Sequence, residues 1–258
     1  MTAHFNACVI EDANRLFTPD ELALIDCRIC PKHIAIIMDG NRRWAKQKEL
    51  SPILGHWEGA ETLVDVVRAA VLLGVKTLTV YSFSTENWER SNEEVFALMD
   101  LFELYLLRKE EWMCKEGVRL DAIGDLTRLP ARLQEVFLRT KEKTSRGEKI
   151  NLVLALNYGA RDEIRRAVEK IIQEREETKQ AREEITEELI AKHLDTQKWG
   201  DPDLLIRTSG ELRLSNFLLW QISYAELYVT DVLWPDFSAR NLYEAVLSFQ
   251  HRHRRKGG

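Results

Sequence analysis

The amino-acid sequence predicts a single α/β domain in which helices flank a central, mostly parallel sheet of about six strands. Short apolar runs alternate along the chain with longer segments whose apolar residues recur at helical spacing, which is the order expected of a parallel sheet with helices on both faces. Polar turn residues follow several of the apolar runs. The 258 residues, of which 45% are hydrophobic, are enough for one sizeable core.

The first half of the chain contains three predicted strands. Residues 34–38 have the length and β-branched content of a strand buried on both faces, and Asp39, Gly40 and Asn41 supply turn chemistry where this strand stops. A helix begins after that turn. The remaining elements of this half are a helix over residues 60–73, strands over residues 77–83 and 118–124, and between these strands a long helix over residues 91–116.

The second half repeats the alternation and ends in a helix. After a helix over residues 129–143 and a strand over residues 150–157, a long amphipathic helix follows whose charged distal part, residues 173–188, breaks near Thr186. The last elements are strands over residues 203–207 and 227–230 and a helix over residues 238–252. We expect residues 1–30 to form a peripheral arm and residues 31–258 the main domain.

Composition and charge exclude several classes of protein. The net charge of −5 and a pI near 5.8 argue against nucleic-acid binding, which depends on a basic footprint. The sequence has no basic-plus-apolar N-terminal signal and no apolar run near the roughly 20 residues of a membrane span. Four cysteines fit a reducing compartment. We therefore expect a cytoplasmic protein with no transmembrane segment.

Polar clusters follow three of the predicted strands, and all lie where ligands bind in parallel sheets. Their arginines suit phosphate oxygens, and Asp39 and Glu226 are candidate ligands for a hard cation. The arginines of these clusters carry more positive charge than one monophosphate needs. Two diphosphates, or a nucleotide with a long anionic tail, fit better. The phosphate-binding candidates are Arg42, Arg43, Arg90, Arg207 and Arg213, with hydrogen-bonding partners Asn41, Ser84, Asn87 and Ser215.

Nucleotide enzymes are disfavoured by missing motifs. The sequence has no Gly-x-x-x-x-Gly-Lys-Ser/Thr loop and no Gly-x-Gly-x-x-Gly after the first strand. The Asp-Asp-x-x-Asp motif of trans-type prenyl synthases is absent as well.

Five segments, in order and at matching spacing, resemble the cis-prenyltransferases, and most closely the bacterial undecaprenyl diphosphate synthases. The resemblance covers the chain from about His33 to its end. The segments are residues 33–46 (HIAIIMDGNRRWAK), Gly55-His56, residues 81–88 (YSFSTENW) with Arg90, residues 157–161 (NYGAR), and residues 203–211 (DLLIRTSGE) with Arg213 and residues 215–221 (SNFLLWQ).

The resemblance implies consecutive condensation of isopentenyl diphosphate onto an allylic primer, farnesyl diphosphate, with Mg2+ assistance. It makes Asp39 the magnesium-linked carboxylate with Glu226 near the metal, and Asn87 the proposed proton acceptor. A neutral amide is a weak base, so we expect Asn87 to position a diphosphate oxygen or water instead. The implied substrate-binding residues are Gly40, Asn41, Arg42, Arg43, Trp44 and His56 for the primer, Arg207, Arg213 and Ser215 for isopentenyl diphosphate, and Phe83, Ser84, Thr85, Glu86, Trp88 and Arg90 around Asn87.

The product is expected to be a long (Z)-polyprenyl diphosphate in the undecaprenyl range, the cell-wall lipid carrier. The apolar stripe of residues 91–116 either joins the core or lines a hydrophobic tunnel for this chain, and the resemblance places Ile150 at the tunnel floor. It also implies a homodimer that delivers its product to the membrane, with the protein either free in the cytoplasm or peripheral at the inner face. The basic C-terminal residues 251–256 either remain solvated or contact anionic lipid or a partner subunit.

Three positions depart from the family pattern. Pro52 stands where the family commonly has an arginine, four residues before His56, so one primer contact is in doubt. Arg42 stands where many bacterial members have glycine, and we hypothesise that it partly replaces the lost cation. Leu212 replaces a histidine of some members. Two other functions remain as alternatives, namely a non-catalytic partner subunit of the same fold and a magnesium-dependent phosphatase or nucleotide-binding enzyme.

Overall fold

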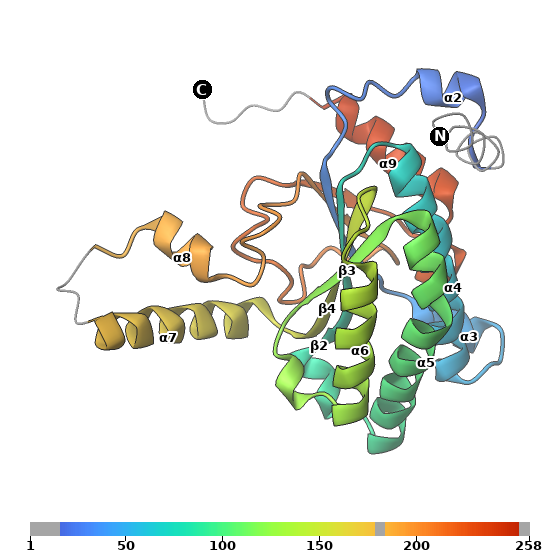
Figure 1. Ribbon diagram of the computed structural model, residues 1–258. Helices are drawn as coiled ribbons and strands as arrows, with labels where there is room; N and C mark the ends of the chain where they lie inside the picture. Colours follow the sequence, from blue (N-terminus) through green and yellow to red (C-terminus); the bar gives the residue numbers. More distant parts are fainter. Residues whose placement is uncertain (1–15, 179–183, 253–258) are drawn as a thin grey trace.

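A computed structural model describes residues 16–178 and 184–252. Its six strands form one sheet in which every neighbouring pair is parallel, in the order β3-β4-β2-β1-β5-β6 (Figure 1). The predicted fold class is therefore confirmed. The strands are β1 (His33–Ile37), β2 (Thr77–Ser84), β3 (Val118–Ile123), β4 (Ile150–Tyr158), β5 (Leu204–Arg207) and β6 (Glu226–Val229).

Strand β1 lies where the strand order changes direction. From β1 the chain builds the sheet outward on one side through β2, and it later crosses to the other side of β1 to add β5 and β6. Such a switch point leaves a crevice at the carboxyl end of the strand, because the connections on its two sides diverge there. The turn at Asp39 and Gly40, which follows β1 directly, occupies this crevice.

Each face of the sheet has its own apolar core. The larger core lies beneath α4 (Pro52–Leu72), α5 (Asn92–Glu116), α6 (Ala131–Thr144) and α9 (Ala239–Gln250), of which α4, α5 and α6 lie side by side in Figure 1. The smaller core, on the opposite face, packs Tyr158, Phe217 and Leu218 against β1 and β4. Burial on both faces explains why the predicted strands are continuous apolar runs.

Helix α4 begins eight residues earlier than predicted, at Pro52. The added turns contain two glycines, which are unfavourable in helix interiors. Here both are required: a Cβ on Gly55 would lie 2.1 Å from the Asn41 carbonyl oxygen, and one on Gly59 would lie 2.4 Å from Asn41 Oδ1. The first turns of α4 thus pack directly on α3 (Asn41–Gln47), the helix that follows the β1 turn.

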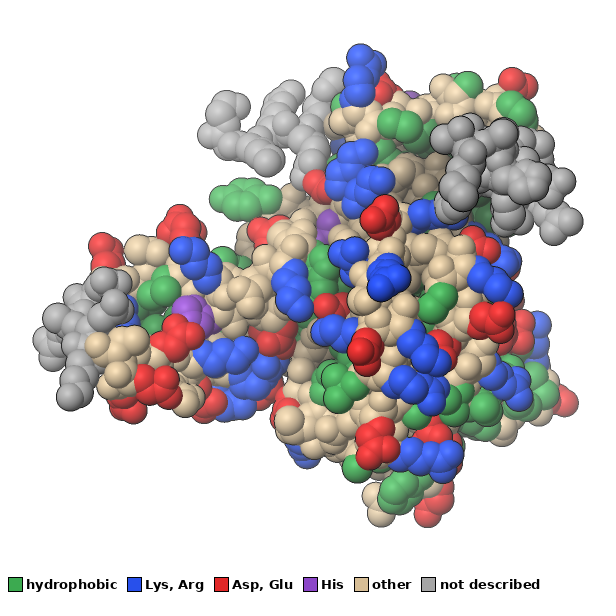
Figure 2. Space-filling view, viewed as in Figure 1, with side chains coloured by type: hydrophobic (Ala, Val, Ile, Leu, Met, Phe, Trp, Pro, Cys, Tyr) green, Lys and Arg blue, Asp and Glu red, His purple; other side chains and the backbone are tan. Residues whose placement is uncertain are grey.

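Helices α7 (Ala160–Thr178) and α8 (Glu187–His193) lie side by side and project away from the sheet (Figure 1). Acidic and basic side chains are interspersed over them (Figure 2), as the charged sequence of this segment predicts. Arg166 of α7 holds Asp195, just after α8, through two hydrogen bonds of 2.9 and 2.6 Å. Thr186 caps α8 by accepting from the Leu189 amide, at the predicted break.

The described part of the expected N-terminal arm packs against α9. Short helix α2 (Pro19–Ala23) is anchored by the Tyr243 hydroxyl, which donates to the Glu21 carbonyl at 2.9 Å, and the ring of buried Phe17 lies 5.5 Å from that of Tyr243. Residues 1–15 of this arm, and residues 253–256 of the basic C-terminal segment, lie outside the described residues.

Candidate active site

A polar basin of about 810 Å3 lies beyond the carboxyl end of β1. The turn after β1 supplies its floor, and the loop after β5 supplies one wall. The basin gathers residues that are far apart in the sequence, because the parallel strands all end at this edge. Eight of the predicted site residues line it: Asp39, Gly40, Asn41, Arg42, Arg43, His56, Arg90 and Arg213.

Asp39 lies between two guanidinium groups. Arg207, which is 5% exposed, donates from Nη2 to Asp39 Oδ2 at 2.9 Å, and Arg43 Nη2 lies 3.4 Å from the same oxygen. Burial alone would raise the pKa of Asp39, but the hydrogen bond and charge of Arg207, with the charge of Arg43, lower it below its usual value. Asp39 is therefore an ionised carboxylate at neutral pH.

The loop after β5 holds Arg207 from its other side. Arg207 Nη1 donates to Ser215 Oγ at 2.8 Å and to the Arg213 carbonyl. Ser209, Ser215 and Asn216 all have positive φ, at 75°, 49° and 60°. Non-glycine residues adopt this left-handed conformation at an energetic cost, and such residues cluster at functional sites. The loop is thus shaped to present its polar groups to the basin.

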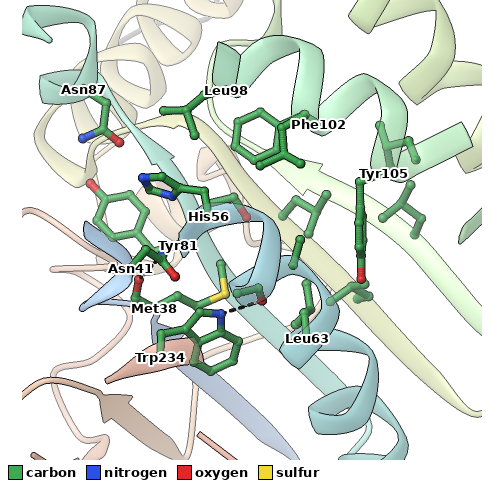
Figure 3. Close-up of a pocket in the computed structure, with 18 of the residues that line it drawn as sticks. Met38, Asn41, His56, Leu63, Tyr81, Asn87, Leu98, Phe102, Tyr105 and Trp234 are labelled. Atoms are coloured by element: carbon green, nitrogen blue, oxygen red, sulfur yellow. Dashed lines mark hydrogen bonds between the residues drawn. The ribbon is translucent and has the colours of Figure 1, made fainter. Parts of the chain in front are cut away.

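An apolar cavity of about 140 Å3 adjoins the basin (Figure 3). It lies between α4, α5 and strands β2 to β4, where the sequence suggested a tunnel, and the tunnel itself stays a prediction. Along α5, its lining runs from Leu98 to Met113, about 22 Å at 1.5 Å per residue. Met38, Asn41, His56 and Arg90 line both hollows. The basin and the cavity therefore meet at these four residues.

Two polar atoms at this junction have no hydrogen-bond partner among the described residues. They are Asn41 Oδ1 and His56 Nε2, and both are buried. Burial, followed by the charges of Arg90 and Arg42, lowers the pKa of His56 to about 4. His56 is therefore neutral at physiological pH, when one ring nitrogen donates and the other accepts. Unpartnered polar atoms aimed into a cavity mark a ligand position.

Asn87 lies at the mouth of the cavity, on the short 3-10 helix that follows β2. Its Oδ1 accepts from the Ser84 amide at 3.0 Å, which leaves the Nδ2 amide group to donate to a ligand. Arg90, three residues later, bonds Glu94 at 2.8 Å and reaches the junction.

Eight predicted substrate-binding residues are not among those lining either hollow. Two of them, Arg207 and Ser215, form the hydrogen-bonded pair described above, and the other six pack around the site. Phe83 is buried and packs against Trp88, whose Nε1 donates to Asn157 Oδ1 at 2.7 Å. Trp44 is 7% exposed and donates to Asp236 at 2.7 Å, behind the turn. Ser84, Thr85 and Glu86 form the start of the 3-10 helix, where Glu86 accepts from Asn216 at 2.9 Å. These six support the residues that line the site.

The expectation that Glu226 lies near the Asp39 metal is wrong within a single chain. Glu226 begins β6 and pairs with Leu204, at the amino end of β5, about 10 Å along the strands from Arg207 at 3.3 Å per residue. Its carboxylate accepts from Arg252 Nη1 at 2.9 Å. The error arose because β6 starts at Glu226, so this carboxylate lies at the edge of the sheet opposite to Asp39.

A divalent cation would have Asp39 and Glu211 as its nearest acidic partners in the basin. Arg43 lies between them, 3.4 Å from Asp39 and 3.5 Å from Glu211. No group of three or more His, Cys, Asp or Glu side chains close enough to enclose a metal occurs in the described residues. Mg2+ commonly binds through one or two carboxylates plus substrate phosphates, and the basin fits that mode.

Sequence reasoning missed three charged residues of the basin, Lys46, Glu49 and Glu211. Lys46 lies within the first motif, one helical turn after Arg42 and Arg43, so helical spacing from the turn was the signal for it. Pro52, which replaces the expected arginine, also lines the basin. Lys46 thus adds a cation on the side where that arginine is missing.

Comparisons with known proteins agree with this geometry. A family model described as "Putative undecaprenyl diphosphate synthase" matches residues 37–257. An isoprenyl transferase of Chlamydia muridarum is 49% identical over 231 residues, which cover 88% of this chain and 91% of the relative. An isoprenyl transferase of Fusobacterium nucleatum is 50% identical over 228 residues, which cover 88% of this chain and 96% of the relative.

Two solved structures share the fold. The crystal structure of lavandulyl diphosphate synthase from Lavandula x intermedia in complex with dimethylallyl diphosphate has a TM-score of 0.86 and 36% identity, and the match covers 90% of this chain and 100% of that one. A probable undecaprenyl diphosphate synthase from Campylobacter jejuni has a TM-score of 0.75 and 35% identity, over 88% and 99% of the two chains. The chain therefore belongs to the undecaprenyl diphosphate synthase family and is a prenyltransferase.

Proposed function

We propose that this prenyltransferase condenses isopentenyl diphosphate consecutively onto farnesyl diphosphate, with Mg2+, to give a long-chain (Z)-polyprenyl diphosphate of the undecaprenyl class for the cell-wall lipid carrier. The observation that carries the proposal is the junction of the cationic basin with the apolar cavity at Met38, Asn41, His56 and Arg90. A ligand with an anionic head and an apolar tail fits this pair of hollows, whereas a sugar phosphate has no apolar part to fill the cavity.

The primer diphosphate and the diphosphate of isopentenyl diphosphate would bind on opposite sides of the basin. Arg42 and Arg43, on the turn after β1, are suited to the primer diphosphate, whose allylic C–O bond breaks and leaves negative charge on the departing group. Arg213 and the Arg207–Ser215 pair, after β5, are suited to the diphosphate of isopentenyl diphosphate. Fixed cations at the point where charge develops lower the barrier selectively.

Asp39, with Glu211 beside it, would hold Mg2+ against the diphosphate oxygens. Bound there, the cation would neutralise charge on the leaving group as a Lewis acid. The ionised state of Asp39, maintained by Arg207, suits this role.

Asn87 acts as a donor rather than as a base. Because its Oδ1 accepts from the Ser84 amide, its Nδ2 can orient a diphosphate oxygen, and that oxygen is the better acceptor for the proton lost from isopentenyl diphosphate. Neutral His56 can in turn donate to the leaving primer diphosphate from the unpartnered Nε2 position.

Incubating the purified protein with Mg2+, farnesyl diphosphate and labelled isopentenyl diphosphate tests the proposal. We expect an organic-extractable labelled product that is lost in Asp39→Asn and kept in Glu111→Gln, a control at an exposed carboxylate of α5. Folded protein that forms no such product would contradict the proposal. Tight farnesyl diphosphate binding without product would favour the partner-subunit alternative, and release of inorganic phosphate from a phosphate ester would favour the phosphatase alternative.

Membrane delivery of the product needs no membrane-spanning element. Among the helices of the described residues, none combines the length and apolar content needed to cross a bilayer. We propose that the product leaves to the membrane from a protein that is peripheral to it.

A further inference from the structure

Asn216 lies where three loops at the active-site edge of the sheet meet. It belongs to the loop after β5, one residue after Ser215. The other two loops are the turn after β4 and the 3-10 helix after β2, which carries Asn87. A Cβ on Gly159 would lie 2.6 Å from Thr85 Oγ1 and 2.7 Å from Asn216 Nδ2. The three loops are therefore packed so closely that no side chain fits between them.

Asn216 forms hydrogen bonds with both neighbouring loops. Its carbonyl oxygen accepts from the Ala160 amide at 2.8 Å, and its Oδ1 accepts from the Arg161 amide at 3.0 Å. Its Nδ2 donates to Glu86 Oε1 on the 3-10 helix at 2.9 Å. One residue thus connects the loop after β5 to the turn after β4 through two bonds, and to the 3-10 helix through a third.

The backbone of Asn216 is left-handed, with φ at 60°, and that of Ser215 is left-handed as well. Asparagine is one of the few non-glycine residues that tolerate this conformation, because its short polar side chain can hydrogen-bond locally. The two adjacent side chains bond different partners. Ser215 Oγ accepts from Arg207 at 2.8 Å, whereas the side chain of Asn216 bonds the other two loops.

Glu86 is the partner of Asn216 on the 3-10 helix, and it directly precedes Asn87. Burial alone would raise the pKa of Glu86, but hydrogen bonds, first of all the one from Asn216, lower it below its usual value. Glu86 is therefore an ionised carboxylate, and a hydrogen bond to an ionised group is stronger than one between neutral groups. This bond links a neighbour of Ser215 to a neighbour of Asn87.

We propose that the Asn216–Glu86 hydrogen bond positions Ser215 and Asn87 relative to each other, so that two bound substrates meet in a reactive geometry. The proposal rests on the prenyl-transfer function proposed above. Neither Asn216 nor Glu86 lines the basin or the cavity, so both act as positioning residues. A misplacement of about 1 Å between reacting groups can slow a reaction about a hundredfold.

The loop after β5 has other anchors that stay in place when the side chain of Asn216 is removed. The ring of buried Phe217 stacks on that of Tyr81 at 4.4 Å, and the Tyr81 hydroxyl lies 3.3 Å from the Ser215 carbonyl oxygen. Glycine adopts left-handed φ without cost. Asn216→Gly should therefore fold, with the same net charge and without the two side-chain bonds.

Steady-state kinetics and calorimetry test the proposal together. In Asn216→Gly we expect kcat to fall by about tenfold or more. Affinity for isopentenyl diphosphate alone and for farnesyl diphosphate alone, each with Mg2+, should stay within about twofold of wild type, because Ser215 and Asn87 keep their own partners. Asn151→Ala, which removes two asparagine hydrogen bonds at the opposite edge of the sheet, should leave kcat unchanged. A wild-type kcat in Asn216→Gly, or a loss confined to the affinity for one substrate, would overturn the proposal.

Exchanging donor and acceptor tests the partner. Asn216→Asp places two carboxylates against each other and should lower kcat further. Adding Glu86→Gln supplies an amide donor, so the bond can form again in the reverse direction, and kcat should return toward wild type. Asn216→Asp combined with Glu111→Gln has the same net charge but no new donor, and should stay slow. An exchanged pair as slow as Asn216→Asp alone would overturn the proposal.

Hydrogen exchange tests the bond without catalysis. In Asn216→Gly the amides of residues 212–217 should exchange roughly fivefold faster than in wild type, as expected for the loss of about one net hydrogen bond. In Asn151→Ala they should exchange as in wild type. Unchanged exchange in Asn216→Gly would overturn the proposal whether or not the protein is active. A folded wild-type protein that forms no product would instead contradict the prenyl-transfer function.

Discussion

Burial sets the charge of two histidines that the sequence places far apart. His33 is 4% exposed, with Nδ1 donating to the Gly200 carbonyl at 3.1 Å and Nε2 accepting from the Thr79 hydroxyl at 2.8 Å in the neutral tautomer. Burial lowers the pKa of His33 and of His56 to about 4 in each case. Both are therefore neutral in the folded protein and titrate near 6.5 when it unfolds.

Stability should consequently fall as the pH drops from 6.5 toward 4. Between these two pH values the unfolded chain binds protons that the folded chain does not. The free energy of unfolding is therefore highest above pH 6.5 and falls until the pH reaches the folded-state pKa of about 4. The loss is about 3 kcal/mol per histidine over the whole window. Urea unfolding at a series of pH values measures it, and His33→Gln should reduce the slope relative to wild type. A flat profile between pH 6.5 and 4.5 would contradict the assignment.

Arg42 and Pro52 provide the residue-scale test of how the primer is held. Both line the basin, and Arg42 is exposed, 3.8 Å from Glu94. Arg42→Gly should weaken farnesyl diphosphate binding roughly fivefold, about 1 kcal/mol for an exposed charge, and Pro52→Arg should strengthen it. Arg28→Gly, at an exposed arginine outside the basin, is the matched control. Normal primer affinity in Arg42→Gly would refute the idea that Arg42 replaces the missing arginine.

At the scale of elements, the sequence predicted the helices and strands that local residue patterns determine. It did not predict the features that depend on packing between elements. The strands were predictable because burial on both faces requires continuous apolar runs. The first two turns of α4 were not, because Gly55 and Gly59 contradict helix propensity, and only their contacts with Asn41 and, for Gly59, with Trp234 explain them. Asp39 was placed correctly from its position after β1. Glu226 was misplaced because the family resemblance put it near the metal, although the predicted strand over residues 227–230 already had it at the amino end.

Gly59→Ala tests the contact between α4 and the site. The new Cβ would lie 2.4 Å from Asn41 Oδ1 and 2.7 Å from Trp234 Cδ1. Overpacking of this kind costs about 1–3 kcal/mol, although the same change at a free helix position would stabilise. We expect a lower urea midpoint and weaker primer binding, because Asn41 must move. Glu58→Ala, at the exposed neighbouring position, should leave both unchanged. A Gly59→Ala protein as stable as wild type would show that the packing around Gly59 has room for a methyl group.

At the scale of the whole molecule, the sequence motifs predicted most of the residues that line the basin. They did not predict the size or shape of the adjoining cavity. The basin could be anticipated because all parallel strands end at one edge. The apolar stripe of α5 favoured core and was also compatible with a tunnel, since periodicity shows which face is apolar and not whether that face is filled. The size of the cavity, and the position of Tyr105 in its wall, depend on how α4 packs against α5.

The exposed face of edge strand β6 leads to the prediction of a homodimer. On β6, Glu226 and Tyr228 are half-buried, while Leu227 and Val229 are 51% and 38% exposed, and nearby Tyr224 is 79% exposed. Apolar side chains on an edge strand favour pairing with another chain. We expect a mass near twice the 30.0 kDa of one chain by light scattering, and a monomer for Leu227→Lys. Phe96→Lys, at a 66% exposed apolar residue of α5, should stay dimeric. A dimeric Leu227→Lys protein, or a monomeric wild type, would exclude β6 as the interface.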